Sequence, residues 1–296
     1  MPRVLLIHNP VASRTEPETV RTVSAVWERA GWSVDVAATA HNGHAAELAR
    51  QGVADKVDVV AVYGGDGTTM HAVSGLVGSD VTIGLIPGGT GNLLAGNLRV
   101  PRDPARAAQV IIKGNSRAID LGRVEWDSTV RYFAVNCGAG FAGDLMRATT
   151  GEAKRRWGVG AYVLRAWSTI GDTPRAHYRI TVDGTPVEVD ASLVMVLNCG
   201  EMFPPYFRMR DGIAVDDGIL DVVAYSWNGF LDSIGLLWNV FRGTEQQRVV
   251  YARGRKIRVD ADQSRELQID GDPVGTTPFT AEIVPGAVRV LVPNGD

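Results

Sequence analysis

Residues 57–97 read VDVVAVYGGDGTTMHAVSGLVGSDVTIGLIPGGTGNLLAGN and contain two short apolar runs, each followed by a glycine-rich loop. The first run, at 57–62, leads into GGDGT at 64–68, and the second, at 81–86, leads into PGGTGN at 87–92. Short runs rich in Val and Ile are typical of strands that are buried on both faces of a parallel sheet. A segment that can form a helix follows each loop, so the stretch predicts two strand-loop-helix units.

The two loops have the composition of a phosphate-binding site. In open α/β sheets, ligands bind outside the carboxyl ends of the strands, where helix N-termini present free N–H groups to an anion. Glycine lets the backbone approach a phosphate closely, and the hydroxyls of Thr68 and Thr90 can add hydrogen bonds. The alternative is that both loops are tight turns without a ligand.

The chain has 296 residues and a net charge of −3, which suits one large globular domain or, more naturally, two. Nucleic-acid-binding proteins usually carry an excess of basic residues, whereas this chain is slightly acidic, so no nucleic-acid partner is expected. No run approaches the roughly 18 apolar residues of a membrane span, and the apolar run at 4–7 indicates a first strand rather than a signal peptide. Cys137 and Cys199 are expected to be buried free thiols, and a cytoplasmic location is expected.

Up to about residue 124, predicted strands and helices alternate. Besides the two loop-bearing strands, strands are predicted at 4–8 and 33–38, and helices at 16–30 and 45–50. The first helix has a predicted capping box formed by Thr15 and Glu18 and a stop at Gly31. The alternation predicts an α/β domain with a parallel sheet and flanking helices.

After residue 124 the pattern changes to short alternating segments separated by turns, which predicts an antiparallel β domain. Strands are predicted at 131–137, 175–182, 187–199, 219–225, 256–261, 266–269 and 287–292, and helices at 160–170 and 228–241. Asp183-Gly184 is a good signal for a hairpin turn. We place the domain boundary near residue 127, which gives domains of residues 1–127 and 128–296.

Six short motifs follow one another along the chain. They are Asn9-Pro10, GGDGT at 64–68, PGGTGN at 87–92, IDLG at 119–122, Asp216-Asp217-Gly218 and Asp270-Gly271-Asp272. Together they resemble the diacylglycerol kinase catalytic-domain family, bacterial lipid kinases related to sphingosine and ceramide kinases, and the resemblance covers nearly the whole chain. It implies an N-terminal nucleotide-binding α/β domain like that of NAD kinases and phosphofructokinases, and a C-terminal antiparallel β-sandwich that binds lipid.

The resemblance implies a reaction in which the γ-phosphoryl of Mg²⁺–ATP passes to a lipid hydroxyl, most often that of diacylglycerol, to give phosphatidic acid. The implied nucleotide contacts are Asn9, Pro10, Val11, Ala12, Ser13, Thr39, Gly64, Gly65, Asp66, Gly67, Thr68, Thr69, Met70, His71, Gly89, Thr90 and Asn92. The family's catalytic base closes an Asp-Gly-Glu motif and maps onto Asp272, while Asp66 would face the catalytic Mg²⁺–ATP. A carboxylate suits the base, because phosphoryl transfer needs mainly positioning, charge neutralisation and a group that accepts the hydroxyl proton.

Asp216-Asp217-Gly218 offers oxygen ligands of the kind that Mg²⁺ prefers, although such a sequence alone usually forms only a turn. The resemblance implies a structural Mg²⁺ at this motif. Its ligands would be Asp217, with Asp216 beside it, and the carbonyls of Ala214 and Ile219. A carboxylate network is also implied, from Asp217 through Asp120 to Asp66.

A lipid substrate would be presented at a membrane surface, so peripheral contact with the inner face of the membrane is expected. The aromatic segment EMFPPYF at 201–207 is a candidate lipid contact or, about equally, a buried connection. The basic segment KRRW at 154–157, with Arg147, is a candidate contact for anionic headgroups or an ordinary solvated face. A homo-oligomer is compatible with the sequence.

Two other functions stay open on the sequence alone. A soluble-metabolite kinase of the NAD kinase type shares the first glycine loop, and a catalytically silent lipid- or nucleotide-binding protein would fit the departures from the family pattern. These departures are Ala12-Ser13, Met70-His71, Leu93 and Asp272. The histidines at 8, 41, 44 and 177 show no metal-ligand spacing with Cys or carboxylate partners, so no zinc site is expected.

Overall fold

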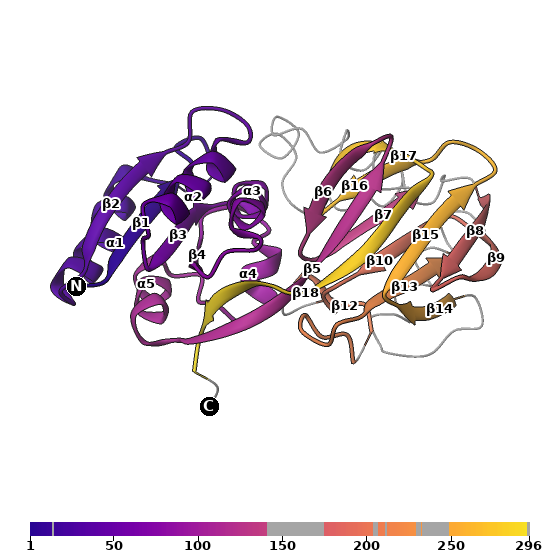
Figure 1. The fold of residues 1–296 in the computed structure, drawn as a ribbon. Coiled ribbons are helices and arrows are strands. Elements are labelled where there is room, and N and C mark those ends of the chain that lie inside the picture. The colour runs from indigo at the N-terminus through magenta and orange to yellow at the C-terminus, as the bar shows by residue number, and fades with distance from the viewer. Residues whose placement is uncertain are drawn as a thin grey trace. The chain divides into compact units, whose positions relative to one another are not determined.

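A computed structural model describes residues 1–13, 15–140, 175–203, 207–210, 212–228, 232 and 249–294. Contacts divide the chain into two compact units, whose elements are labelled in Figure 1. Unit 1 consists of Met1–Leu121, Glu201–Tyr206 and Pro285–Asp296, and unit 2 consists of Gly122–Gly200 and Phe207–Val284. Unit 1 thus takes in two segments from the second half of the chain, and the division at residue 127 stays a prediction from the sequence.

Unit 1 is built on a parallel sheet with the strand order β2-β1-β3-β4 (Figure 1). The strands are β1 (Arg3–His8), β2 (Ser33–Ala38), β3 (Val59–Gly64) and β4 (Thr82–Pro87). Every residue of β3 is buried, as its apolar run predicts. The last part of β18 (Phe279–Val292) pairs with β4 through Arg289 and Val290. The predicted parallel sheet is confirmed.

Helices follow the strands of this sheet in alternation. They are α1 (Pro17–Arg29), α2 (His44–Ala54), α3 (Asp66–Leu76), α4 (Leu93–Asn97) and α5 (Pro104–Lys113). The two predicted loop-to-helix transitions are confirmed, because α3 and α4 follow the two glycine loops. Among the helices of the described residues, none is both long and apolar enough to cross a membrane.

The start of α1 differs from the prediction. Glu16 occupies the N-cap position without a side-chain hydrogen bond, and the hydroxyl of Thr15 is buried without a partner, so the predicted capping box is wrong. Pro17 instead opens the helix, where its fixed φ is already helical and its missing N–H costs nothing. The predicted stop is confirmed, since Gly31 adopts a φ of +81° directly after the helix.

Unit 2 contains antiparallel strands from two sheets. One sheet has the order β14-β13-β10-β7-β16-β17, and strands β9, β8, β15 and the first part of β18 lie in the other. Strand β11 (Glu201–Phe203) lies in unit 1, and β5 (Asn115–Trp126) runs from unit 1 into unit 2. The remaining strand bounds are β6 (Thr129–Phe133), β7 (Asn136–Gly140), β8 (Ala176–Val182), β9 (Thr185–Ala191), β10 (Leu193–Leu197), β12 (Phe207–Arg208), β13 (Leu220–Tyr225), β14 (Val249–Gly254), β15 (Lys256–Ala261), β16 (Glu266–Ile269) and β17 (Asp272–Thr276). The predicted antiparallel β-sandwich is confirmed.

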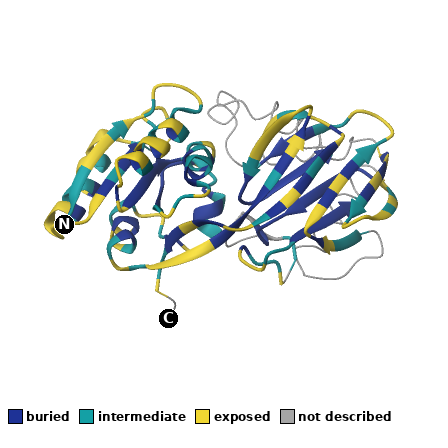
Figure 2. Cartoon of the chain, viewed as in Figure 1, coloured by how far each residue is buried: buried dark blue, intermediate teal, exposed yellow. Residues whose placement is uncertain are grey.

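The core of unit 2 forms where one face of each sheet is apolar. Buried and exposed residues alternate along β8 and β15, and this alternation is visible in Figure 2. Phe133, Tyr178 and Phe279 are the largest fully buried side chains of this core. Alternation of this kind leaves one face of a sheet for the core and one for water.

Several element boundaries in unit 2 differ from the sequence prediction. The predicted strands 131–137 and 187–199 are each two strands, broken at Ala134 and at Ser192. Strands β5, β11, β12, β14 and β17 and the first part of β18 were not predicted. The predicted helices at 160–170 and 228–241 lie outside the described residues apart from Asn228 and Asp232. The predicted hairpin is confirmed: Asp183 and Gly184 have positive φ angles between β8 and β9.

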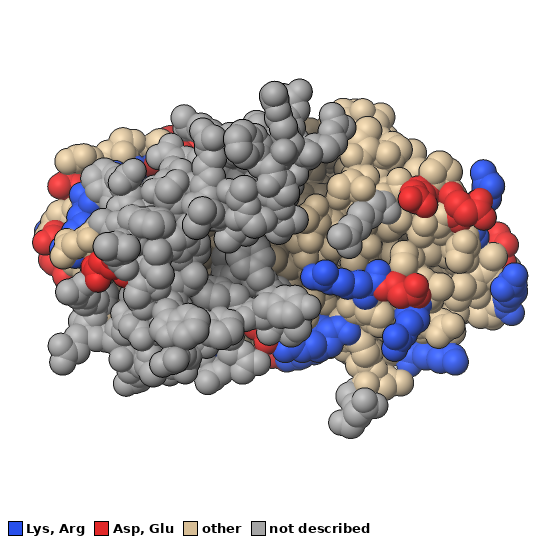
Figure 3. Space-filling model, turned by 180° about the vertical axis from the view of Figure 1, so that it is seen from behind, with Lys and Arg blue, Asp and Glu red and all other residues tan. Residues whose placement is uncertain are grey.

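Basic and acidic side chains lie next to one another on the surface. Figure 3 shows this mixture on the described part of the face that is in view. Arg3 pairs with Asp35 at 3.2 Å and Arg21 with Glu18 at 2.9 Å, and all four side chains are well exposed. Exposed pairs of this kind each contribute about 0–1 kcal/mol to stability.

Candidate active site

The loops that follow β1, β3 and β4 meet at the carboxyl ends of these neighbouring strands. The amide of Gly88 donates to the carbonyl of Gly64 at 2.8 Å, which joins the two glycine loops. The side-chain amide of Asn9, just after β1, donates to the hydroxyl of Thr68 at 3.0 Å. The hydroxyls of Ser13 and Thr90 lie 3.3 Å apart. The structure therefore brings together the predicted nucleotide contacts of three separate sequence motifs.

The two glycine loops approach each other so closely that a side chain would not fit between them. A Cβ placed on Gly89 would lie 2.5 Å from the Cα of Gly65, and one on Gly64 would lie 2.9 Å from the Cβ of Thr68. Both distances are shorter than nonbonded carbon contacts allow. The glycines thus let the loops interlock, and Gly64 and Gly89 are themselves buried by this packing.

The first turn of α3 offers backbone donors at this place. Gly65 is the N-cap, makes no side-chain cap hydrogen bond, and accepts the first helical bond from the amide of Thr69 at 3.0 Å. The amides of the three preceding residues have no acceptor within the helix, as at any helix start. Together with the helix dipole, they favour an anion at this position.

Asp66 connects the first glycine loop to the start of α4. Its carboxylate accepts hydrogen bonds from the amides of Asn92, at 2.7 Å, and Leu93, at 2.5 Å. The side chain of Asn92 in turn closes the second loop by bonding both the amide and the carbonyl of Gly89, at 2.9 and 2.8 Å. Asp66 and Asn92 therefore hold the loops in shape, and the catalytic role of Asp66 stays a prediction.

Other predicted nucleotide residues surround these loops. Thr39, after β2, donates its amide to the carbonyl of His8 at 2.9 Å, which places it beside the end of β1. Pro10 and Val11 are exposed, and the amide of Val11 donates to Asn9 at 3.1 Å. Gly67 is exposed on α3, while Ala12 and Thr69 are half-buried.

Met70 and His71, which depart from the family pattern after the first glycine loop, have different environments. Met70 is only 9% exposed and belongs to the buried side of α3. His71 accepts a hydrogen bond from the amide of Gly43 at 3.1 Å, which ties α3 to the start of α2. Both side chains are thus engaged in holding the fold of unit 1, a role that the sequence did not reveal.

An ion pair between the half-exposed Arg99, just after α4, and the buried Glu201 joins these two segments. Arg99 binds the Glu201 carboxylate with two hydrogen bonds, at 2.7 and 2.6 Å, and the Glu201 side chain is only 7% exposed. Asn97 bonds the backbone of Glu201 in both directions, at 2.8 and 3.2 Å. This clamp, formed by Asn97, Arg99 and Glu201, fixes the first residue of the predicted aromatic lipid-contact segment, of which 204–206 lie outside the described residues.

We expect Glu201→Gln to lower the free energy of unfolding by about 2 kcal/mol, because a neutral amide cannot replace two charge-assisted bonds. Glu18→Gln is the matched control, since Glu18 forms an exposed pair with Arg21, and its effect should stay below about 0.5 kcal/mol. Urea unfolding of both variants measures the difference. Equal midpoints for the two variants would show that the clamp does not stabilise unit 1.

In unit 2, Asp270 and Asp272 have opposite environments although they belong to one turn. The Asp270 carboxylate accepts three backbone amides: Ala134 at 3.1 Å, Val135 at 2.9 Å and Asn136 at 2.9 Å. With positive φ angles at Asp270 and Gly271, the turn joins β16 to β17. Asp272 opens β17 and is exposed. Asp270 is therefore a structural carboxylate, and Asp272 is the one available to a substrate.

The predicted carboxylate network involves both units. Asp120 is 3% exposed and accepts the amide of Gly286 at 2.8 Å within unit 1. Asp217 belongs to unit 2, where it accepts the amide of Ile219 at 3.2 Å and pairs with Arg253 at 2.5 Å. Asp216 is exposed next to it. A continuous chain from Asp217 to Asp66 stays a prediction, and no sequence motif points to Arg253 as a partner of Asp217.

Two of the histidines lie close to a carboxylate, although the sequence predicts no histidine with metal-ligand spacing to such a partner. His41, His44 and Glu47 bring their ligand atoms within 4.8 Å of one another. However, the Nδ1 of His44 accepts the amide of Ala40 at 3.0 Å, so its neutral ring carries the proton on Nε2 and has no lone pair left for a metal. We assign no metal to this cluster.

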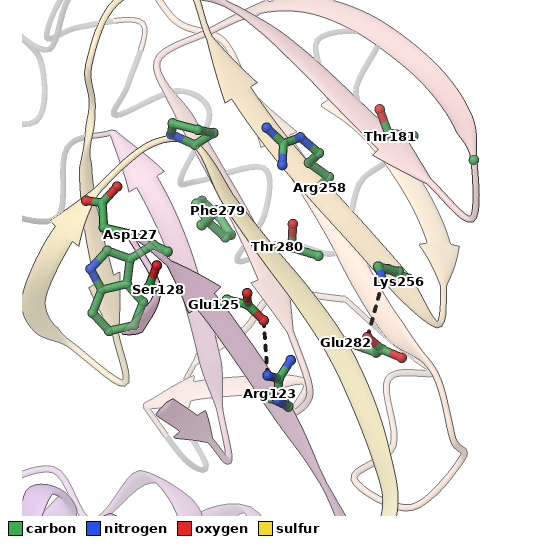
Figure 4. A pocket seen from close by; sticks show the side chains of 13 residues that line it. Arg123, Glu125, Asp127, Ser128, Thr181, Lys256, Arg258, Phe279, Thr280 and Glu282 are labelled. Carbon is green, nitrogen blue, oxygen red and sulfur yellow. Dashed lines mark hydrogen bonds and ion pairs between the residues drawn. The ribbon is translucent and has the colours of Figure 1, made fainter. Parts of the chain in front are cut away.

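A hollow of about 590 Å³ lies on unit 2, and its lining includes none of the predicted site residues. Figure 4 shows its side chains, including Arg123, Lys256 and Arg258. Each of these cations already has a carboxylate partner: Glu125 at 3.0 Å, Glu282 at 3.5 Å and Asp260 at 2.7 Å, respectively. The hollow therefore offers no strong site for an anion, and we assign it no ligand.

Comparison with known proteins bears on both units. Residues 3–124 match the family model described as the diacylglycerol kinase catalytic domain, and residues 138–292 match the model described as the YegS C-terminal NAD kinase beta sandwich-like domain. The chain belongs to the diacylglycerol kinase catalytic-domain family. As a member of this family it is a lipid kinase, as its six motifs predict.

Diacylglycerol kinases of two bacteria are similar to the chain over nearly its whole length. The one from Bacillus subtilis strain 168 is 26% identical, with 99% of this chain and 97% of the relative covered. The one from Staphylococcus aureus strain MRSA252 is 24% identical, with coverages of 99% and 93%. A crystal structure of a candidate diacylglycerol kinase from Bacillus anthracis strain Sterne superimposes with a TM-score of 0.80 at 25% identity, covering 98% of this chain and 97% of that one.

Proposed function

We propose that the chain transfers the γ-phosphoryl of ATP to the hydroxyl of diacylglycerol and so forms phosphatidic acid. The observation that carries the proposal is the meeting of two interlocked glycine loops with Asn9 and Thr68 at the start of α3. Backbone amides of this kind suit the phosphates of a nucleotide. Membership of the diacylglycerol kinase family and the similarity to proteins of that name support the choice of lipid.

ATP fits the residues present in unit 1, because the first turn of α3 starts without a side-chain cap and carries the exposed Gly67, where backbone can approach a phosphate. The amides at the start of α3 would bind phosphate oxygens, and the hydroxyls of Ser13 and Thr90 would lie beside them. When bound with the nucleotide, Mg²⁺ supplies neutralisation of the phosphate charge. Asp66 and Asn92 hold these donors in position before the nucleotide arrives.

We assign the base to Asp272. As the bond from the lipid oxygen to the γ-phosphorus forms, the bond from that phosphorus to the β,γ-bridging oxygen breaks, and ADP leaves with the electron pair. The hydroxyl proton passes to the Asp272 carboxylate. Support for this assignment comes from its exposure and from the contrast with Asp270, whose carboxylate is already committed to three amides.

We further propose that the protein meets its substrate by peripheral contact at the inner face of a membrane, because diacylglycerol is a membrane lipid. The predicted basic contact at 154–157 with Arg147 lies outside the described residues. The clamp of Asn97, Arg99 and Glu201 holds the first residue of the segment 201–207, the candidate lipid contact, in place.

A radiolabelled-ATP screen over diacylglycerol, ceramide, a long-chain base, phosphatidylglycerol and NAD tests the proposal. We expect label in the product of diacylglycerol and none in that of NAD. Label in NADP instead would identify a metabolite kinase, and bound ATP without any labelled product across the panel would identify a silent binding protein. Either outcome would contradict the proposed function.

A further inference from the structure

The acidic turn that resembles a structural Mg²⁺ site has a cation of its own. Arg253 on β14 pairs through Nη2 with the Oδ2 atom of Asp217 at 2.5 Å. The other oxygen of Asp217, Oδ1, accepts the amide of Ile219 at 3.2 Å, so both oxygens of the expected metal ligand are engaged. The carboxylate among the ligands that the family resemblance implies is therefore engaged by groups of the chain itself.

Arg253 also neutralises a second carboxylate, which is fully buried. Strands β13 and β14 pair with Asp221 directly opposite Arg253, and the guanidinium Nε lies 3.0 Å from the Oδ1 of Asp221. Tyr251 donates its hydroxyl to the same oxygen. The Asp221 side chain is 1% exposed, and burial raises its pKa. Its other oxygen, Oδ2, is buried without a hydrogen-bond partner.

The carboxylates of this cluster share a positive charge that the chain itself supplies. Asp217 and Asp221 contribute two negative charges, and Arg253 contributes one positive charge between them. A second guanidinium, that of Arg210, lies over the ring of Tyr251 at 4.0 Å from its centroid. A divalent ion at Asp217 would add two positive charges beside a guanidinium that already touches the same oxygen, and like charges at such distances repel strongly.

Coordination geometry leads to the same result. Mg²⁺ requires a nearly octahedral shell of oxygens at about 2.0–2.1 Å. Arg253 contacts one oxygen of Asp217, and Ile219 donates its N–H to the other. A guanidinium is permanently charged and binds carboxylates through a fixed set of donors, so it can replace a metal as the neutralising group.

We propose that Arg253 is the built-in cation of the 214–219 turn, so that this turn binds no divalent metal. This inference concerns the turn alone and does not depend on which acceptor the kinase phosphorylates. It also implies that, where the enzyme requires a divalent ion, the ion acts with the nucleotide and not at Asp217.

The first test uses the unaltered protein without nucleotide. Mn²⁺ binding followed by electron paramagnetic resonance is expected to show no stoichiometric site that Asp217→Asn removes, and the Tm is expected to be the same in Mg²⁺ and in EDTA. A stoichiometric Mn²⁺ site that disappears in Asp217→Asn would overturn the proposal. Because it needs no substitution of Arg253, this measurement tests metal binding at the turn even where an Arg253 variant does not fold.

The second test asks whether the arginine replaces a metal. In Arg253→Gln the two carboxylates lose their cation, so the Tm should fall in EDTA and recover in part when Mg²⁺ is added. The double variant Arg253→Gln with Asp217→Asn should lose that recovery. Arg255→Gln, which changes an exposed arginine after the same strand, is the matched control and should not respond to Mg²⁺. An Arg253→Gln protein whose Tm ignores Mg²⁺ would count against the proposal.

Discussion

Asp272→Asn is expected to lower the rate of lipid phosphorylation by about 10²–10⁴-fold, the usual contribution of a general base. The side chain keeps its size and loses only its ability to take the hydroxyl proton. Because Asp272 is exposed, stability should change by less than about 0.5 kcal/mol. Steady-state transfer of label from ATP to diacylglycerol measures the rate, and urea unfolding measures the stability.

Two controls make this experiment specific. Asp272→Glu supplies the residue that usually closes the family motif, so it should retain substantial activity. Asp127→Asn removes another exposed aspartate of unit 2, to which no role is assigned, and should leave the rate close to that of the parent protein. Near-normal turnover in Asp272→Asn would show that another group accepts the proton.

Asp270→Ala is expected to have the largest effect on stability, a loss of about 3 kcal/mol or more in the free energy of unfolding. The substitution leaves three amides without their acceptor in a place where Ala134, Val135 and Asn136 are almost fully buried. Asp270→Asn retains one acceptor oxygen and should fall between the parent and the alanine variant. Chemical unfolding followed by circular dichroism measures the series.

The neighbouring aspartate is the matched control for this series. Asp272→Ala changes the same residue type two positions along the same turn, yet it should leave the unfolding midpoint nearly unchanged because Asp272 is exposed. If Asp270→Ala were as stable as Asp272→Ala, the three hydrogen bonds would have no net value. The assignment of Asp270 as a structural carboxylate and of Asp272 as the exposed one without a structural role would then be wrong.

Strands whose local pattern agrees with their environment were predictable. The sequence predicts β2, β15 and β16 with the bounds that the structure has, because their ends coincide with turns and charged residues. Strand β7 was not separable from β6, since the break at Ala134 depends on a carboxylate 136 residues away in the sequence. Strand β14 was not predicted, although its partner β13 was, because the pairing of the two strands joins residues far apart in the sequence.

In the candidate site, too, local features were predictable and contacts between distant residues were not. The glycine loops were predictable, because glycine, threonine and the preceding apolar runs are local features. The clamp between Arg99 and Glu201 joins residues 102 positions apart, and Arg253 meets Asp217 across 36 positions. No periodicity or motif encodes such pairs. Side chains that the motifs mark as ligands, such as Asp66 and Asp217, also acquire structural partners that only the fold reveals.

The most direct test of the proposed reaction compares the fate of two phosphates of ATP in the presence of diacylglycerol. With label in the γ-phosphate, the unaltered protein should produce labelled phosphatidic acid. With label in the α-phosphate, the lipid should stay unlabelled and all label should be found in ADP and remaining ATP. Unlabelled lipid in both reactions, or lipid labelled from the α-phosphate, would contradict γ-phosphoryl transfer to diacylglycerol.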